Sequence, residues 1–214
     1  MAIVLDQVTK TYGDLKVLDK LSLTFPDTGI IGLFGPSGCG KTTLIHLMAG
    51  LQQADSGSIH NIKAHSVSMV FQEDRLLPWM TAGDNLNLIY NDISKTKLWL
   101  ERLQIEHQQD AYPDELSGGM KRRLALARAL GFKADLLLLD EPFKGLDIKL
   151  KHQIYPYVKQ CGSEKLVILV THDPSEIMGL ADFIWSAGGP PLTLKKIDHD
   201  LFSKHWLQTD ADFV

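Results

Sequence analysis

The feature that most constrains the fold of this 214-residue sequence is a glycine-rich segment between a predicted strand and a predicted helix. The apolar run Ile30–Phe34 predicts a buried strand, and helical residues follow over Thr42–Ala49. Between them lies Gly35–Thr42, GPSGCGKT, in which two glycines with four residues between them are followed by lysine and threonine. These residue types in this context predict a strand, a phosphate-binding loop and a helix in one continuous unit.

Each residue type of this loop has a reason in phosphate chemistry. Glycines let the backbone turn so that its N–H groups converge on phosphate oxygens, and the helix N-terminus adds partial positive charge. Lys41 is expected to reach the β- and γ-phosphates, and the Thr42 hydroxyl to ligate Mg²⁺. A glycine-rich turn with a chance lysine is the alternative, which the flanking strand and helix disfavour. The predicted nucleotide-binding residues are Gly35, Pro36, Ser37, Gly38, Cys39, Gly40, Lys41, Thr42 and Thr43.

Strands alternate with helices along most of the chain, which predicts the α/β fold class. Short β-rich runs before residue 26 predict an N-terminal antiparallel β subdomain, and helical periodicity over 73–130 predicts an inserted helical subdomain. The expected fold is a P-loop NTPase whose mostly parallel sheet is covered by helices. We expect a single domain, 1–214, with its core in 1–72 and 131–214, and no structure is predicted after Pro191.

Two carboxylates follow a second buried strand. The run Leu136–Leu139 leads directly into Asp140 and Glu141. Because ligands of a doubly wound sheet collect at the carboxyl ends of its strands, this segment and the glycine-rich loop can face one site. Asp140 is expected to hold Mg²⁺, directly or through water, and Glu141 to act as base or positioner for an attacking water. A polar cap at the end of the strand is the alternative.

A second anion-binding feature lies at Leu116–Met120, LSGGM. Ser117 is a good helix N-cap whose hydroxyl can also bond a phosphate oxygen, and Gly118 and Gly119 permit close backbone approach. The cationic residues that follow, Lys121–Arg123, predict a mostly solvated helix face. Two anion sites in one short chain need an explanation, because one triphosphate needs only one phosphate-binding loop.

Composition and charge exclude several classes of protein. The sequence has 22 Lys and Arg against 26 Asp and Glu, a net charge of −4, whereas a general nucleic-acid binder carries a basic excess. Its longest apolar stretches are too short to cross a bilayer, and no signal peptide opens it. Two cysteines form no disulfide framework, so a reduced, cytoplasmic setting is expected.

Nearly the whole sequence resembles the ATP-binding subunit of an ABC transporter. Leu116–Met120 resembles the family signature LSGGQ, with Met120 in place of the usual glutamine. The resemblance implies ATP as the bound nucleotide and Mg²⁺ as its cofactor. It also implies roles for four further residues, which occur in family order. Tyr12 would stack on adenine, Gln72 would contact Mg²⁺ and the attacking water, Asp147 would act across a dimer interface, and His172 would touch the γ-phosphate.

The resemblance also explains the two anion sites. It implies a homodimer in which each ATP is held between the glycine-rich loop of one copy and Ser117, Gly118, Gly119 and Asp147 of the other. ATP binding would close this dimer and hydrolysis of the β–γ bond would open it. Those motions would drive membrane permease subunits, which implies a peripheral location at the cytoplasmic face of the cell membrane.

A finer resemblance lies in Val70–Leu86, which is similar to the nitrate, sulfonate, taurine and thiamine-precursor importer branch. This resemblance implies import, and with it a separate solute-binding protein. Leu76, Leu77 and Trp79 are either core of the inserted subdomain or, for at least one of them, exposed for a membrane-subunit helix.

Two other functions stay open. The first is a soluble ABC-type ATPase that acts on nucleic acid. Repair relatives of that kind carry a long coiled coil between loop and signature, whereas only 75 residues separate Lys41 from Ser117, with no heptad run. The acidic charge balance also counts against nucleic acid as a partner. The second is a switch that binds ATP without hydrolysing it, which the presence of Glu141 and His172 disfavours.

Overall fold

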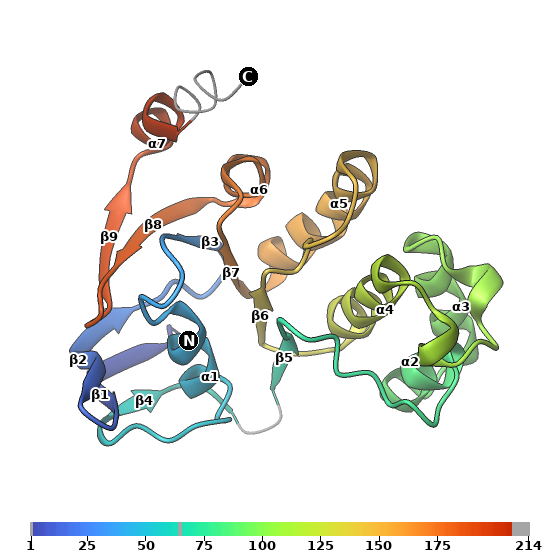
Figure 1. Ribbon diagram of the computed structural model, residues 1–214, viewed down its shortest axis with the longest axis horizontal. Helices are drawn as coiled ribbons and strands as arrows, with labels where there is room; N and C mark the ends of the chain where they lie inside the picture. Colours follow the sequence, from blue (N-terminus) through green and yellow to red (C-terminus); the bar gives the residue numbers. More distant parts are fainter. Residues whose placement is uncertain (1, 64–65, 207–214) are drawn as a thin grey trace.

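The computed structural model describes residues 2–63 and 66–206, which form two β-sheets with helices around and beside them (Figure 1). The smaller sheet is antiparallel, in the order β2–β1–β4. The larger sheet has the order β5–β6–β7–β3–β8–β9, and its pairings are parallel except for that of β8 with β9. The strands are β1 (Val4–Tyr12), β2 (Leu15–Thr24), β3 (Gly29–Phe34), β4 (Ser56–His60), β5 (Val67–Val70), β6 (Leu136–Asp140), β7 (Leu166–Thr171), β8 (Phe183–Gly188) and β9 (Thr193–Ile197).

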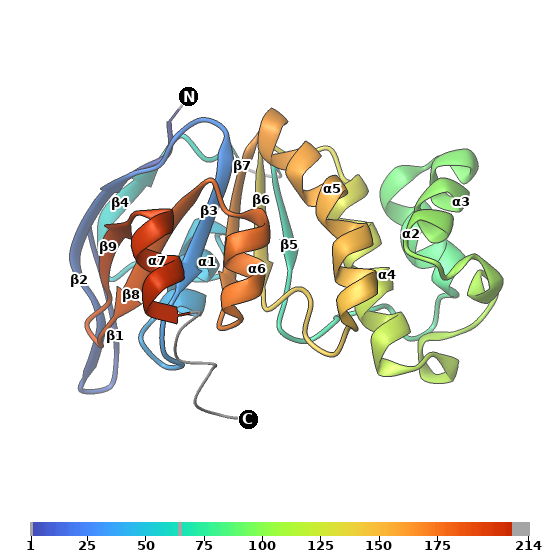
Figure 2. The same cartoon turned by 90° about the horizontal axis from the view of Figure 1, so that it is seen from above.

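The helices divide between the large sheet and a group beside it. Those that pack on the large sheet or follow it are α1 (Lys41–Met48), α5 (Ile148–Glu164), α6 (Pro174–Leu180) and α7 (His199–Trp206). Those of the lateral group are α2 (Ala82–Tyr90), α3 (Ile93–Arg102) and α4 (Gly118–Gly131), with short 3₁₀ helices at Glu106–Gln108 and Pro113–Glu115. Both views show this group lying beyond β5, away from the small sheet (Figures 1 and 2).

The central strands are buried on both faces, which is why they are continuous apolar runs. Leu137 and Leu139 of β6 belong to one core cluster, which includes α4 and α5. Leu136 and Leu138, which point to the opposite face, belong to a second cluster with α1 and the small sheet. The sheet therefore has helices on one face and α1 with the small sheet on the other, as in Figure 2.

Helices of the lateral group begin at residues that cap them. Thr81 accepts a hydrogen bond from the Asp84 N–H at 3.1 Å, and Asp92 accepts one from the Lys95 N–H at 3.0 Å. Such side chains satisfy backbone donors that the first helical turn leaves unpaired.

The predicted α/β class, mostly parallel sheet and antiparallel N-terminal sheet are confirmed. The exact boundaries of the helical insertion, 73–130, stay a prediction.

The segment after Pro191, for which no structure was predicted, contains β9 and α7. Phe202 of α7 is fully buried, and its ring packs edge-on against Phe34 at 5.2 Å between ring centres. The short, lysine-containing strand β9 owes its structure to antiparallel pairing with β8, a long-range contact that local patterning does not reveal.

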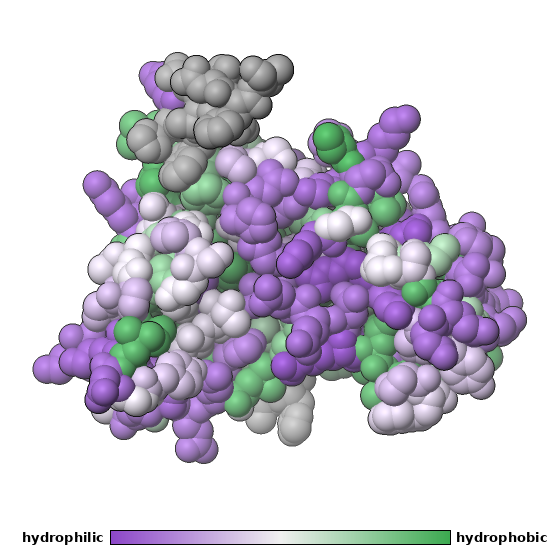
Figure 3. Space-filling view, in the orientation of Figure 1, coloured by the Kyte–Doolittle hydropathy of each residue, from purple (hydrophilic) through white to green (hydrophobic). Residues whose placement is uncertain are grey.

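No helix within residues 2–63 and 66–206 has the length and apolar character needed to cross a bilayer. On the face shown in Figure 3, hydrophobic residues occur in separate patches among hydrophilic ones.

Candidate functional site

The predicted phosphate-binding loop connects β3 to the N-terminus of α1. A Cβ atom at Gly35 would lie 2.1 Å from the carbonyl oxygen of Ala187 in β8, so only glycine fits there. Gly40, with a φ of +110°, is the N-cap residue of α1, and no side chain caps this helix. The first backbone N–H groups of α1 therefore remain available to an anion.

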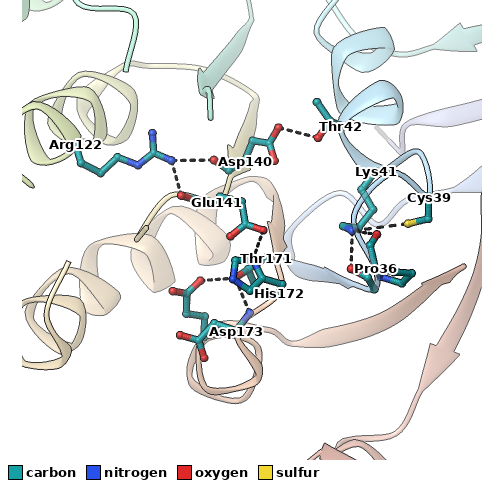
Figure 4. Close-up of polar contacts among 12 residues, drawn as sticks. Pro36, Cys39, Lys41, Thr42, Arg122, Asp140, Glu141, Thr171, His172 and Asp173 are labelled. Atoms are coloured by element: carbon teal, nitrogen blue, oxygen red, sulfur yellow. Dashed lines mark hydrogen bonds and ion pairs between the residues drawn. The ribbon is translucent and has the colours of Figure 1, made fainter. Parts of the chain in front are cut away.

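Lys41 is folded over this loop (Figure 4). Its ammonium donates hydrogen bonds to the carbonyl oxygens of Gly35 at 2.7 Å and Pro36 at 2.8 Å, and it lies 3.7 Å from the sulfur of Cys39. Lys41 is only 7% exposed. A largely buried cation beside uncapped backbone N–H groups makes this loop a site for anionic groups.

Thr42 and Asp140 meet across the gap between α1 and the end of β6. The Thr42 hydroxyl donates a 3.0 Å hydrogen bond to the Asp140 carboxylate (Figure 4). Asp140 is 2% exposed, and this burial raises its pKa above the usual value. The hydrogen bond from Thr42 opposes the shift without reversing it. Mg²⁺ prefers oxygen ligands and commonly takes one or two from the protein and the rest from phosphates and water. The Thr42 hydroxyl and the Asp140 carboxylate fit that set of ligands. Among the described residues, no group of three or more His, Cys, Asp or Glu side chains could hold a metal ion by itself.

Glu141 is held directly beside His172. Its carboxylate oxygen lies 2.8 Å from the His172 Nδ1 atom, and Figure 4 shows the two side chains pointing toward each other. The Glu141 backbone has a φ of +48°, and its N–H donates to the carbonyl oxygen of Val170 at 2.8 Å. A carboxylate oriented by a histidine is an arrangement suited to accepting a proton from a bound water.

A cleft of about 410 Å³ brings most of the predicted residues together. Its lining includes the glycine-rich loop, both carboxylates and two residues from distant parts of the chain, Tyr12 and Gln72. Val17 and Val170 also line the cleft and were not predicted from the sequence, because an apolar side chain carries no chemical signature of a site. The lining residues are Tyr12, Val17, Ser37, Gly38, Gly40, Lys41, Thr42, Thr43, Gln72, Asp140, Glu141 and Val170.

The second predicted anion site lies outside this cleft. Ser117 caps α4, where its hydroxyl accepts a hydrogen bond from the Met120 N–H at 3.3 Å, and it is exposed together with Gly118. A Cβ atom at Gly119 would lie 3.9 Å from the carbonyl oxygen of Gly145, in the turn before α5. Asp147, which caps α5, is also exposed. The two predicted anion sites of one chain therefore do not form a single site.

Comparison with known proteins identifies the family. Residues 18–144, more than half of the chain, match a family described as ABC transporter. The chain belongs to the ABC transporter family. It is 36% identical to a probable sulfate/thiosulfate import ATP-binding protein CysA of Chlorella vulgaris, over 86% of each chain. It is 38% identical to the sulfate/thiosulfate import ATP-binding protein CysA of Vibrio cholerae, over 85% of this chain but only 54% of that longer protein.

A solved structure is similar to this ABC family chain as well. It is the dimeric structure of a post-hydrolysis state of the ATP-binding cassette MJ0796 bound to ADP and Pi. The two chains superpose with a TM-score of 0.78 at 26% identity, over 86% of this chain and 93% of that one.

One expectation about this ABC family chain is wrong. Lys121–Arg123 was predicted to be a mostly solvated helix face, but Arg122 is buried, at 4% exposed. Its side chain points away from solvent, toward the ends of β5 and β6 (Figure 4). A run of three cations on a helix next to a polar cap gives no sign of which one is buried, because that depends on distant backbone segments.

An ionic network next to His172 in the chain, between α5 and the start of α6, was not predicted from the sequence. The Lys151 ammonium lies 2.8 Å from the Asp173 carboxylate and 2.6 Å from that of Glu176. Burial by itself would raise the pKa of Asp173, but hydrogen bonds from Lys151 and Ser175 lower it to about 2. This network ties α5, the helix capped by Asp147, to the segment that carries His172, and no spacing rule in the sequence would have found it.

Proposed function

We propose that this chain binds and hydrolyses Mg-ATP as the nucleotide-binding subunit of an ABC importer. The observation that carries the proposal is the cleft that the Lys41 loop, the Thr42–Asp140 pair and Glu141 surround. His172 lies outside the lining of this cleft and reaches it through its contact with the Glu141 carboxylate. The Vibrio cholerae and Chlorella vulgaris relatives are named as import ATP-binding proteins, which supports it. The chain spans about half the length of the Vibrio cholerae relative, so we extend the import activity of that longer protein to this chain only as a proposal.

We propose the following role for each group in and beside the cleft. The loop N–H groups and Lys41 would bind the β- and γ-phosphates. Thr42, Asp140 and Gln72 would hold Mg²⁺, which when bound neutralises phosphate charge. Glu141 would accept a proton from the attacking water while the water oxygen bonds to the γ-phosphorus and the bond to the β-phosphate oxygen breaks. ADP would then leave with that electron pair, and His172 would orient Glu141 through their 2.8 Å contact.

The position of the second anion site supports a dimer. Ser117, Gly118 and Asp147 are exposed outside the cleft, so they are free to meet a nucleotide held by a second copy. We propose that two copies bind two ATP molecules between them, with each signature segment, Ser117–Gly119, on the nucleotide of its partner. The dimeric form of the similar cassette MJ0796 supports this arrangement.

We further propose that the partners are membrane permease subunits, together with a separate solute-binding protein, and that the chain lies at the cytoplasmic face of the membrane. The similarity of Val70–Leu86 to the nitrate, sulfonate, taurine and thiamine-precursor branch supports import, while the cargo would be chosen by the partners. Purification from native membranes tests this, with co-purifying integral membrane subunits as the expected result. Recovery of the chain with nucleic acid, and without membrane proteins, would contradict it.

Loss of the Trp79 side chain should weaken that association. Its side chain is 70% exposed on the loop before α2, and exposed aromatic residues often dominate protein interfaces. The buried Asn85 amide holds this loop by bonding to Leu77, Met80 and Thr81, so the loop should keep its shape without the indole. We expect Trp79→Ala to reduce co-purification of membrane subunits about tenfold, with ATP binding unchanged. Leu201→Ala, at an exposed position on α7, is the matched control, and equal recovery for both variants would remove Trp79 from the interface.

Tyr12 should contribute to affinity through its ring. It is 43% exposed at the edge of the cleft, with its hydroxyl bonded to Gln52 and the Lys10 ammonium 5.5 Å from the ring centre. Because stacking a base on an aromatic ring contributes about 1–3 kcal/mol, Tyr12→Ala should weaken ATP binding about 5- to 150-fold. Tyr12→Phe should stay within about twofold of the parent. Equilibrium titration with ATP and with inorganic triphosphate checks this, since only the ligand with a base should be affected.

A further inference from the structure

Arg122 binds the backbone at the end of β6. Its Nε–H donates to the Pro142 carbonyl oxygen at 2.9 Å, and its Nη2 donates to the carbonyl oxygen of Asp140 at 2.9 Å and to that of Glu141. Figure 4 shows the guanidinium reaching from α4 to the backbone of the two acidic residues. One side chain thus holds three successive carbonyl groups around the proposed general base.

The remaining donors of Arg122 hold the end of β5. Nη1 donates to the Phe71 carbonyl oxygen at 2.6 Å and to the Asp74 carboxylate at 3.0 Å, on either side of Gln72. These contacts use all five N–H donors that an arginine side chain has. A guanidinium is a rigid planar fork, so its bonds fix the two strand ends relative to each other in a way that a lysine ammonium cannot.

Glu141 needs such support because its backbone is in an uncommon conformation. A φ of +48° is sparsely populated for residues other than glycine and persists where surrounding contacts fix it. Both of its backbone polar groups are bound: the N–H donates to Val170, and the carbonyl accepts from Arg122 and from the Lys144 N–H at 3.2 Å. In this conformation the carboxylate points to His172.

We propose that Arg122 is a positioning residue for hydrolysis: it holds the left-handed backbone of Glu141 and thereby aims the carboxylate at the attacking water. Arg122 is absent from the lining of the cleft, so it acts through Glu141 and does not touch the nucleotide. The inference rests on the proposed function, since it concerns a step of ATP hydrolysis. It predicts a loss in turnover without a matching loss in nucleotide binding.

The first test compares Arg122→Met, which keeps an unbranched side chain without donors, with Arg122→Lys, which keeps the charge without the fork. We expect both to lower kcat about tenfold or more, while the Kd for ATP stays within about threefold of the parent. Arg102→Met is the matched control, because the Arg102 guanidinium lies over the rings of Trp99 and Tyr157, which do not line the cleft, and its kcat should stay within about twofold. Turnover within threefold of the parent for both Arg122 variants would overturn the proposal.

The second test asks whether Arg122 acts through Glu141. Single-turnover hydrolysis is measured with chain in excess over Mg-ATP, for Arg122→Met in the parent and in a Glu141→Gln background. If Arg122 works by placing this carboxylate, its loss should cost less than about twofold more once Glu141 is already replaced. An equal fold loss in both backgrounds would show an independent effect and overturn the proposal.

The outcomes separate this inference from the proposed function. A parent chain that binds Mg-ATP without hydrolysing it contradicts the hydrolytic function itself. A parent that hydrolyses ATP, with Arg122 variants of equal turnover, contradicts only the role of Arg122. Unfolding of both Arg122 variants, seen by circular dichroism, would assign this residue to the stability of the fold and likewise overturn the proposal.

Discussion

Glu141→Gln is expected to lower ATP turnover by about 10²- to 10⁴-fold, the usual contribution of a general base. The amide keeps the size of the side chain and can still meet His172, which lies 2.8 Å from the carboxylate, but it cannot accept the proton of the attacking water. Binding of Mg-ATP should persist, because the phosphate loop and the Thr42–Asp140 pair are untouched. Turnover is measured as released phosphate at saturating Mg-ATP, with the exposed Glu101→Gln on α3 as the control.

The same variant should trap the ATP-bound homodimer. If hydrolysis opens the dimer, then a chain that binds ATP and cannot hydrolyse it should elute as a stable dimer from size exclusion, whereas the parent stays largely monomeric. Light scattering on the eluted peak gives the mass directly. If both chains remain monomeric at high concentration with saturating Mg-ATP, the proposed ATP-bound homodimer is wrong. Unchanged turnover would instead remove Glu141 from its role as base.

Lys41→Ala is expected to weaken ATP binding by about 100-fold or more, to the point where micromolar chain binds no detectable ATP. The ammonium lies within the loop, and among the residues that the structure describes it is the only side-chain cation that lines the cleft. Without it, the phosphate charge would be met by backbone N–H groups alone. Equilibrium dialysis with labelled ATP provides the measurement.

A matched control separates charge in the cleft from charge on the surface. Lys159→Ala removes an exposed lysine from α5 and should leave ATP affinity unchanged. Because Lys41 also bonds the Gly35 and Pro36 carbonyl oxygens, thermal unfolding of Lys41→Ala should be recorded beside the binding data. Undiminished affinity in a folded Lys41→Ala chain would exclude the proposed contact with the phosphates.

Much of the cleft could be predicted because its chemistry is local in the sequence. The segments Ile30–Thr42 and Leu136–Glu141 each contain a strand and the functional residues at its end. Since parallel strands place their carboxyl ends at one edge of the sheet, two local patterns were enough to predict that the segments with Thr42 and Asp140 face one site. The structure places their side chains 3.0 Å apart.

The parts that could not be predicted depend on contacts between distant segments. The burial of Arg122 follows from where the backbones of Phe71 and Asp140 end, which the sequence around Arg122 does not encode. The network of Lys151 with Asp173 and Glu176 connects α5 to the start of α6, and no local spacing in the sequence predicts it. Roles taken from the family resemblance alone, such as those of Gln72 and Asp147, stay predictions.

The two outer strands of the large sheet limit how copies of this chain can assemble. At one edge β5 has only four residues, and at the other β9 carries the exposed Lys195 and Lys196. Short and cationic edges discourage a neighbouring chain from extending the sheet, which is the usual route to permanent aggregates. Association is thereby left to other surfaces, such as the one that carries Ser117 and Asp147, which can separate again. A subunit whose proposed dimer must open after each cycle of ATP hydrolysis requires such reversible contacts.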